Sequence, residues 1–157
     1  MADVAIYHNI GISKQVKTNC CWFTCLSTVY SYCVNTGRVP CPKDPAQDDV
    51  MKGRFLMNFT IPWDQSVNYA TRLGYSTFDA SPTLAALQKM LLKAPIIFGG
   101  KWNNKEGHWL VINGIAGDQL SYFDPLTGRH VCSWVDFFSG DATDLRPHAE
   151  EPLFYLK

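Results

Sequence analysis

A cysteine at the start of a predicted helix is the residue of this sequence best placed for chemistry. The segment from Cys21 to Tyr32 is apolar or small throughout and has no proline, glycine or charge, which is typical of a buried helix. Asn19 is placed to cap this helix and Gly37 to end it. A thiol in the first turn feels the positive end of the helix dipole, which makes it nucleophilic when a base is near. Cys21 is therefore the candidate nucleophile.

Three other residues, one before Cys21 in the sequence and two after it, supply the groups that thiol chemistry needs. Gln15 lies six residues before Cys21, where its amide and the backbone N–H of Cys21 could form an oxyanion hole. His108 opens one predicted strand and Asp124 ends the next, so a hairpin places both near one end of a sheet. The aspartate would fix the imidazole tautomer that accepts the thiol proton. Asn113 competes for this orienting role, but period-2 alternation turns it away from His108.

These residues are positioned by predicted helices that come first and strands that come later. The predicted helices after the first are Pro62–Leu73, closed by Gly74, and Ser81–Lys93, with a cap and a proline in its first turn. The predicted strands are Ile96–Phe98, His108–Ile115, Gln119–Phe123 and, more weakly, Arg129–Trp134 and Pro152–Leu156. The proline-rich stretch from Pro40 to Asp49 is expected to be an exposed loop. This order predicts an α+β fold, with residues 1–157 forming a single domain.

The composition excludes several classes of protein. The 157 residues are 46% hydrophobic, which indicates a folded globular chain. Fourteen basic residues balance fourteen acidic ones, so no basic face for nucleic acid is expected. No apolar run approaches the roughly 20 residues of a membrane span. The N-terminus lacks the apolar stretch of a signal peptide, so the protein is expected to be made in the cytoplasm.

The six cysteines do not follow a metal-binding pattern. Five of them fall between Cys20 and Cys41 and Cys132 stands alone, and no histidine lies within that first cluster. A zinc site needs paired spacings with nearby ligands, so no metal is expected. Most of these residues are expected to be buried as small hydrophobic side chains. A disulfide between Cys33 and Cys41 remains open for an oxidising compartment.

The chain resembles the papain-like cysteine proteases. The resemblance rests on Gln15 followed by Cys21-Trp22, on the Gly-His-Trp-Leu-Val-Ile segment at His108, and on Tyr-Phe-Asp-Pro at Asp124. It extends over roughly residues 12–138 and is nearest to two compact branches, the leader-peptide-cleaving domains of bacteriocin exporters and the short proteases that bacterial pathogens inject into host cells. The resemblance implies a nucleophile helix packed on an antiparallel sheet. It also implies Cys21 as nucleophile, His108 as general base, Asp124 as orienting residue and Gln15 as oxyanion donor.

Two features depart from the larger members of that family. Only 14 residues precede Gln15, so a long inhibitory pro-segment is not expected, and the third member of the triad is an aspartate rather than an asparagine. Cys20 adds an ambiguity, because it could compete as nucleophile or act as a redox partner. The tryptophan after Cys21 and the spacing from Gln15 favour Cys21.

Aromatic residues near these positions are candidates for binding substrate. Trp22 and Trp109 adjoin Cys21 and His108, and either wall the site or belong to the core. Trp102 lies in the segment from Gly99 to Gly107, which either lines a substrate cleft or forms an exposed hairpin. Gly107 and the three tryptophans are therefore the expected substrate-binding residues.

The resulting hypothesis is a thiol hydrolase that cuts a peptide or isopeptide bond of a protein substrate through an acyl-enzyme, without a cofactor. A transglutaminase or glutamine deamidase would use the same triad, and a catalytically inactive module would only bind peptides. The resemblance implies a bacterial toxin or effector that a dedicated secretion system exports or injects. A cognate immunity or inhibitor protein is then expected as a partner.

Overall fold

The structure is a computed structural model that describes residues 5–11, 15, 17–38, 41–79, 81–101, 107–143, 145–147 and 152–157. These residues form one antiparallel sheet of eight strands, in the order β2-β8-β3-β4-β5-β6, with β1 paired to β4 and β7 paired to β3. The strands are β1 Ala5–Tyr7, β2 Ser76–Phe78, β3 Ile96–Lys101, β4 Gly107–Ala116, β5 Gln119–Asp124, β6 Gly128–Ser133, β7 Arg146–Pro147 and β8 Leu153–Tyr155. The helices are α1 Cys21–Thr36, α2 Asp49–Leu56, α3 Trp63–Leu73, α4 Leu84–Leu91, α5 Trp134–Ser139 and a 3₁₀ turn at Pro45–Gln47.

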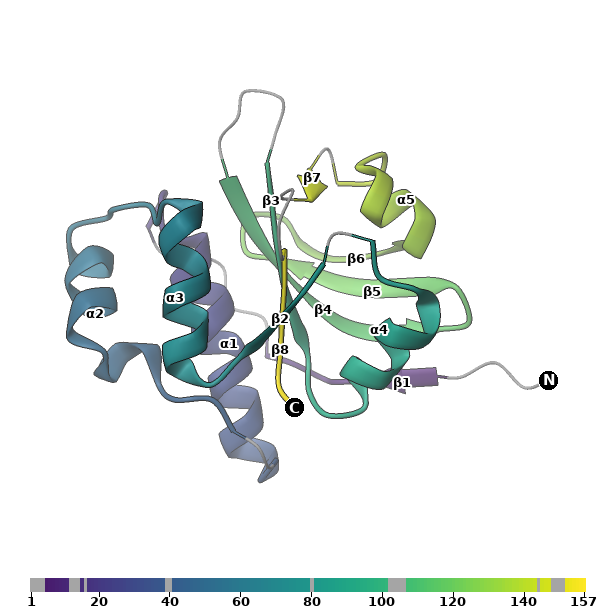
Figure 1. Cartoon of the computed structure of the whole chain (residues 1–157), viewed down its shortest axis with the longest axis horizontal. Helices are drawn as coiled ribbons and strands as arrows, with labels where there is room; N and C mark the ends of the chain where they lie inside the picture. The colour runs from purple at the N-terminus through teal and green to yellow at the C-terminus, as the bar shows by residue number, and fades with distance from the viewer. Residues whose placement is uncertain are drawn as a thin grey trace.

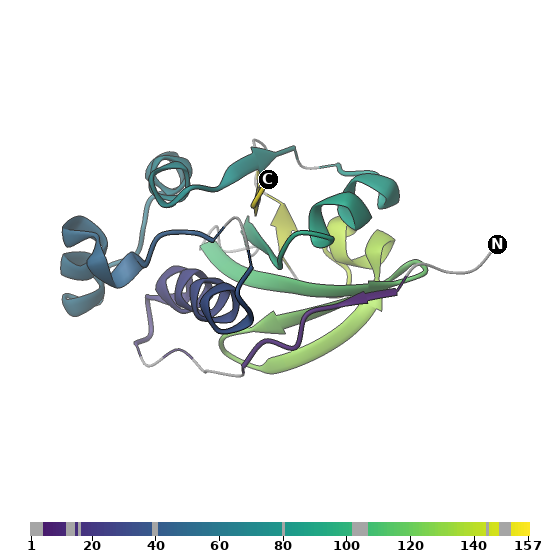
Figure 2. The ribbon, with the colours of Figure 1, turned by 90° about the horizontal axis from the view of Figure 1, so that it is seen from below.

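Helices cover the sheet from two sides. In Figure 1, α1, α2 and α3 gather on one side of the long strand β4, and α4 and α5 lie on the other. Figure 2 shows the same two groups from below, with α4 and α5 over the curved strands. Each group buries its own apolar core against the sheet, and β4 contributes alternate residues to both. Trp109 and Val111 pack toward α1, whereas Leu110 and Ile112 pack toward α4 and α5.

Burial on both faces explains why β4 is an unbroken apolar run. A strand with one solvent face alternates apolar and polar residues, whereas every residue from His108 to Ile115 is buried. A bulge between Ile112 and Gly114 interrupts the pairing of β4 with β5. The long strand therefore holds its first residues rigidly at one end of the molecule, the end at which α1 also begins (Figure 1).

The start of α1 at Cys21 and the predicted ends of the first two long helices are confirmed, but the predicted cap of α1 is wrong. Gly37 and Gly74 end α1 and α3 in the left-handed region, at φ of 66° and 104°. The cap of α1 is Cys20 rather than Asn19. Asn19 is held instead by Asn58, which accepts a hydrogen bond from the backbone N–H of Asn19 at 3.1 Å.

Other expected boundaries were displaced by local capping. The predicted helix from Ser81 begins only at Leu84, because the Thr83 side chain caps it by accepting from the N–H of Ala86. Part of the expected loop from Pro40 to Asp49 lies outside the described residues, and its remainder contains the 3₁₀ turn and the Asp48 cap that starts α2. The sequence analysis missed α2. It also assigned Trp134 to a strand, whereas Trp134 starts α5.

Among the helices of the described residues, none combines the length and the apolar character that crossing a membrane requires.

Candidate active site

Cys21 is the first residue of α1 and only 9% of its surface is exposed. The N–H groups of a first helical turn have no partners within the helix, and the helix dipole adds a partial positive charge there. The Cys21 thiol therefore lies beside backbone N–H groups that are free to donate hydrogen bonds to a group bound at this helix end.

Cys20 lies one position earlier and faces a different part of the molecule. It is fully buried, and its Sγ lies 3.8 Å from Oδ1 of Asn58 and 3.7 Å from the backbone oxygen of Phe59. Burial, with the neighbouring Cys21 thiol, raises the pKa of the Cys20 thiol above its usual value. The two adjacent cysteines thus have different partners, and only Cys21 hydrogen-bonds to the histidine described next.

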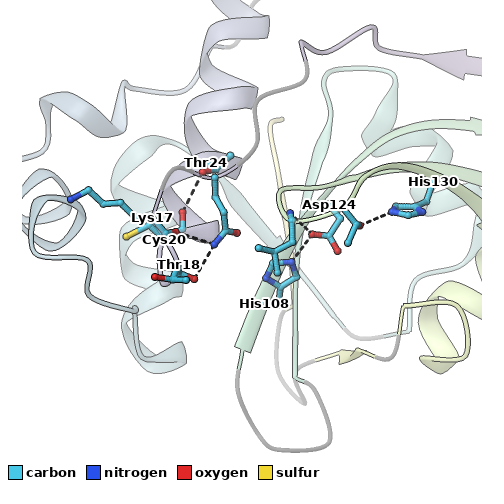
Figure 3. Close-up of polar contacts among 10 residues, drawn as sticks. Lys17, Thr18, Cys20, Thr24, His108, Asp124 and His130 are labelled. Carbon is cyan, nitrogen blue, oxygen red and sulfur yellow. Dashed lines mark hydrogen bonds and ion pairs between the residues drawn. The ribbon is translucent and has the colours of Figure 1, made fainter.

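His108 is the second residue of β4 and is 2% exposed. Its Nε2 lies 2.8 Å from Oδ1 of Asp124, and its side chain also hydrogen-bonds to Cys21. Because Asp124 occupies Nε2, the other ring nitrogen, Nδ1, is left for the thiol. Figure 3 shows the His108 ring directed at the Asp124 carboxylate, across from the chain that leads into α1.

The surroundings of His108 favour its charged form. Burial alone would lower the pKa of this imidazole, but the hydrogen bonds to Asp124 and Cys21 and the charges of both raise it to about 9. His108 therefore holds its proton at neutral pH. An imidazolium beside a thiol favours the thiolate, which is the nucleophilic form of cysteine.

Asp124 ends β5, and its carboxylate is held from more than one side. Oδ1 accepts the N–H of Leu126 at 2.8 Å in addition to the His108 ring, and the Thr127 hydroxyl is a further donor. Burial opposes ionisation, but the hydrogen bond from His108 outweighs it with these other donors and lowers the pKa of Asp124. Asp124 is thus a carboxylate that orients His108 through Nε2.

Gln15 lies on the loop before α1, with its backbone N–H bonded to the carbonyl of Pro125 at 3.1 Å. Its side-chain Nε2 donates to the carbonyls of Lys17 at 3.0 Å and Thr18 at 2.9 Å, and its Oε1 is buried without a hydrogen-bond partner. Gln15 is therefore near the β5–β6 turn, as the hypothesis requires. Both hydrogens of its amide nitrogen, however, are directed at the loop in this conformation.

Asn113 serves the packing of the N-terminal strand instead of the histidine. Its Nδ2 donates to the backbone oxygen of His8 at 3.0 Å, and its Oδ1 accepts from Ser121 at 3.0 Å. The bulge at this point of β4 breaks the simple alternation on which the sequence argument relied. The occupied amide, and not the alternation alone, separates Asn113 from the site.

The four residues expected to bind substrate have different surroundings. Trp22 and Trp109 are almost wholly buried in the core beneath α1, and the Trp22 Nε1 donates to the backbone oxygen of Phe59 at 3.2 Å. This burial favours the core interpretation of both indoles. Gly107 is exposed at the start of β4, next to His108. Trp102 lies outside the described residues.

One supporting residue escaped the sequence analysis. Asn58 adopts a left-handed conformation, with φ of 56°. Its Oδ1 accepts the Asn19 N–H, its backbone oxygen accepts Asn19 Nδ2 at 3.1 Å, and its Nδ2 donates to Thr18 at 3.3 Å. The α2–α3 loop thereby fixes the chain that leads into Cys21. The available sequence signal was an asparagine between two apolar residues, which is compatible with a left-handed turn.

Metal and disulfide chemistry find no support in this arrangement. No cluster of three or more metal-ligating side chains occurs within the described part of the chain. All six cysteines carry free thiols, including Cys33 and Cys41. What the site assembles is a thiol, an imidazole and a carboxylate in hydrogen-bonded order at a helix N-terminus, the set that supports nucleophilic acyl transfer.

Comparison with known proteins shows the family to which the chain belongs. A family model described as "Papain-like cysteine protease AvrRpt2" matches residues 4–141, which is most of the chain. No curated protein matches it. A solved structure, a double glycine motif protease from an AMS/PCAT transporter in complex with the leader peptide, aligns over 99% of this chain and 96% of that one, with 15% identity and a TM-score of 0.48. The predicted superfamily and α+β fold are confirmed, and the chain belongs to the AvrRpt2 family of papain-like cysteine proteases.

Proposed function

We propose that the protein is an active cysteine peptidase in which Cys21 is the nucleophile, His108 the general base and Asp124 the residue that orients the imidazole. The observation that carries this proposal is the order of these three side chains, with Asp124 hydrogen-bonded to Nε2 of His108 and the Cys21 thiol next to the same ring. Few reactions other than acyl transfer use a thiol, an imidazole and a carboxylate in this order.

The reaction follows from the protons that this arrangement can move. With the thiol proton already held on Nδ1 of the His108 imidazolium, the Cys21 thiolate attacks the carbonyl carbon of the scissile bond. The resulting oxyanion accepts hydrogen bonds from backbone N–H groups at the start of α1. The imidazolium then gives its proton to the leaving amine, which departs and leaves a thioester on Cys21. Water, deprotonated by His108, hydrolyses this thioester and restores the thiol.

Gln15 enters this mechanism only after a rearrangement. Its Nε2 lies within hydrogen-bond distance of two loop carbonyls, so one of these bonds must open before Gln15 can donate to the oxyanion. We propose that substrate binding provides this change, because the buried, unpartnered Oε1 shows that the amide is incompletely satisfied as it stands.

The first test is alkylation of the thiols by iodoacetamide between pH 5 and 8, with the modified peptides mapped by mass spectrometry. Cys41 is the internal control, because its side chain is exposed and its slight burial raises the pKa of its thiol. We expect Cys21 to react about tenfold faster than Cys41 at pH 6, although it is less accessible. His108→Ala should abolish this advantage. Equal reactivity of the two thiols in the wild-type protein would exclude an activated nucleophile.

A second measurement separates peptidase action from its alternatives. Incubation with a mixed peptide library, with and without an added primary amine, reports new termini for a peptidase, glutamate in place of glutamine for a deamidase, and amine adducts for a transglutaminase. We expect new termini with wild-type protein and none with Cys21→Ala. Binding of peptides without any of these products would indicate an inactive module.

The biological setting that we propose is delivery into other cells as an effector or toxin, with an immunity or inhibitor protein protecting the producer. Support comes from the sequence resemblance to injected bacterial proteases. Expression of wild-type protein in target cells should be harmful and expression of Cys21→Ala should not. Equal harm from both would exclude a catalytic toxin.

A further inference from the structure

Behind Asp124, on the side away from His108, the β5–β6 turn continues the chain of polar contacts. The backbone of the turn places Thr127 beside Asp124, where its hydroxyl helps to lower the pKa of that carboxyl, and Thr127 Oγ1 lies 2.6 Å from Nε2 of His130. Figure 3 shows His108, Asp124 and His130 in this succession, with His130 on the far side of the carboxylate. Neither Thr127 nor His130 has a role in the mechanism given above.

The number of available protons fixes the direction of every bond in this chain. An ionised carboxylate only accepts hydrogen bonds, so toward Asp124 the Thr127 hydroxyl can act only as a donor of its single proton. The Thr127 oxygen is then an acceptor toward His130, which must carry its proton on Nε2. On the other side of the carboxylate, His108 also donates through Nε2, and its Nδ1 remains for the Cys21 thiol. His130 and His108 thus donate toward the same carboxylate from opposite ends.

The fold holds both residues of this extension in place. The backbone N–H of Thr127 donates to the Asp124 carbonyl at 3.2 Å, and Gly128, with φ of 99°, begins β6 opposite Asp124. The His130 ring stacks on the buried Tyr122 ring, with 5.2 Å between centroids and 25° between planes. Because Tyr122 and His130 are also register partners between β5 and β6, sheet pairing sets the position of the His130 ring.

We infer that Thr127 and His130 are positioning residues of the active site, which hold the Asp124 carboxylate in the orientation that His108 requires. The inference rests on the proposed function. Rotation about the Cβ–Cγ bond of an aspartate is soft, so its carboxylate keeps one orientation only when donors meet its oxygens from fixed directions. Leu126 and His108 both donate to Oδ1, and Thr127 adds a donor that His130 fixes in turn.

A role confined to the turn would have different consequences. The hydrogen bond from Leu126 N–H to Oδ1 already forms an Asx turn, in which Thr127 could simply contribute to local stability. Loss of the Thr127 hydroxyl would then lower the free energy of unfolding without changing the chemistry of Cys21. Loss of a positioning residue weakens the stabilisation of the His108 imidazolium, so the thiolate forms only at higher pH.

The test is the pH dependence of Cys21 alkylation by iodoacetamide, read against unfolding in urea for every variant. Thr127→Val removes the hydroxyl at nearly constant volume, Thr127→Ser keeps it, and His130→Phe keeps the stacking on Tyr122 but removes the donor. Thr71→Val is the matched control, because Thr71 is an exposed threonine on α3 whose hydroxyl bonds only within that helix, to the Val67 carbonyl.

We expect Thr127→Val to slow alkylation of Cys21 at pH 6 about tenfold, which corresponds to about 1.4 kcal/mol, and to shift the midpoint of the pH profile upward. His130→Phe should have a smaller effect in the same direction, and Thr127→Ser and Thr71→Val should match the wild-type protein within about twofold. A Thr127→Val profile that superimposes on a clearly activated wild-type profile overturns this inference and leaves the proposed function intact. A wild-type Cys21 no more reactive than Cys41 overturns both.

Discussion

At the residue scale, the start of α1 gives two adjacent cysteines different chemistry. Cys20 occupies the cap position, with φ of −118°, and Cys21 is the first helical residue. Successive residues of a helix point about 100° apart, so only one of two neighbours can face a given partner. The sequence alone ranked Cys21 above Cys20 by its neighbours Trp22 and Gln15. In the structure, Cys20 contacts the α2–α3 loop and Cys21 contacts His108.

This division predicts the outcome of replacing Cys20. Cys20→Ala should leave the rate and pH midpoint of Cys21 alkylation within about twofold of wild type, because Cys20 has no contact with the imidazole. It should cost about 1 kcal/mol in the free energy of unfolding, since a fully buried sulfur is removed. Urea unfolding and iodoacetamide labelling measure the two effects. A Cys20→Ala protein whose Cys21 has lost its reactivity would reverse the assignment of the nucleophile.

How much of the site could be predicted depended on whether its members carry a local signal. Cys21, His108 and Asp124 each stand at the end of an element with a clear apolar pattern, so hairpin geometry alone placed two of them together. Asn58 and Thr127 carry no such signal, because their importance comes from contacts that only the folded chain creates. Asn58 meets residues about 40 positions away, and Thr127 matters through the carboxylate beside it.

At the element scale, helices and strands with a strongly periodic apolar pattern could be predicted from the sequence. Elements whose main signal is a capping residue could not. β4 was predicted because both of its faces are apolar, and β5 because its alternate residues are apolar. α2 was missed because Met51 is its one buried residue, so no apolar stripe marks it; the Asp48 cap, accepting from the N–H groups of Val50 and Met51, marks its start instead. The first residue of α5, Trp134, was assigned to the preceding strand because an aromatic residue also suits a strand, and the rest of α5 was not predicted.

The α2–α3 loop is the element whose conformation bears most directly on the nucleophile. Asn58 combines a left-handed backbone with side-chain bonds to Thr18 and Asn19, and the same loop accepts the Trp22 indole N–H through Phe59. Lys17 adds a hydrogen bond from its ammonium to the backbone oxygen of Leu56 at 3.0 Å. The loop and the chain before α1 are therefore one hydrogen-bonded unit, and damage to the loop should reach Cys21.

Substitutions at Asn58 separate the two contributions of this residue. Asn58→Gly keeps the left-handed backbone but loses the side-chain bonds, at an expected cost of about 1 kcal/mol in the free energy of unfolding. Asn58→Ala loses the same bonds but keeps a Cβ at positive φ, so it should be about 1 kcal/mol less stable than Asn58→Gly. Both should slow Cys21 alkylation, whereas Met57→Ala, at the exposed neighbouring residue, should change neither property. Urea unfolding that finds the glycine variant less stable than the alanine variant would contradict the conformational argument.

At the scale of the whole molecule, His8 joins the N-terminal segment to the rest of the fold. Its ring is buried, with Nε2 at 2.5 Å from the carbonyl of Leu91 and Nδ1 at 2.8 Å from the hydroxyl of Tyr32. Its backbone N–H donates to the carbonyl of Asn113 at 2.7 Å. One residue thus connects α1, the end of α4 and β4. The carbonyl requires a proton on Nε2, so the neutral ring accepts from Tyr32 through Nδ1.

The pKa values of the two buried histidines are shifted in opposite directions from the ordinary value of this side chain. Burial lowers the pKa of His8 and the charge of Arg38 lowers it further, against the hydrogen bond that the ring donates to the Leu91 carbonyl. The unfolded chain therefore binds more protons than the folded one as pH falls below about 6.5, and stability is lost there. The pKa of His108 is raised to about 9 despite burial, by Asp124 and Cys21. Its contribution is complete below about 6.5 and is lost as pH rises through 9.

These two windows predict that the protein is most stable close to pH 6.5 to 7, with losses on either side that different residues cause. Urea unfolding at pH 5, 6.75 and 8.5 measures this, the upper limit being set at the ordinary thiol pKa of about 8.5, because above it ionisation of Cys33 and Cys132 in the unfolded chain, whose folded pKa values are raised to about 11, would add its own loss of stability. His8→Phe keeps an aromatic edge against Tyr32, and it should remove only the loss of unfolding free energy between pH 6.75 and pH 5. His108→Gln should flatten the basic side alone, where wild type loses about 1–2 kcal/mol between pH 6.75 and 8.5. If either variant flattened the opposite side, the assignment of that side to its histidine would be wrong.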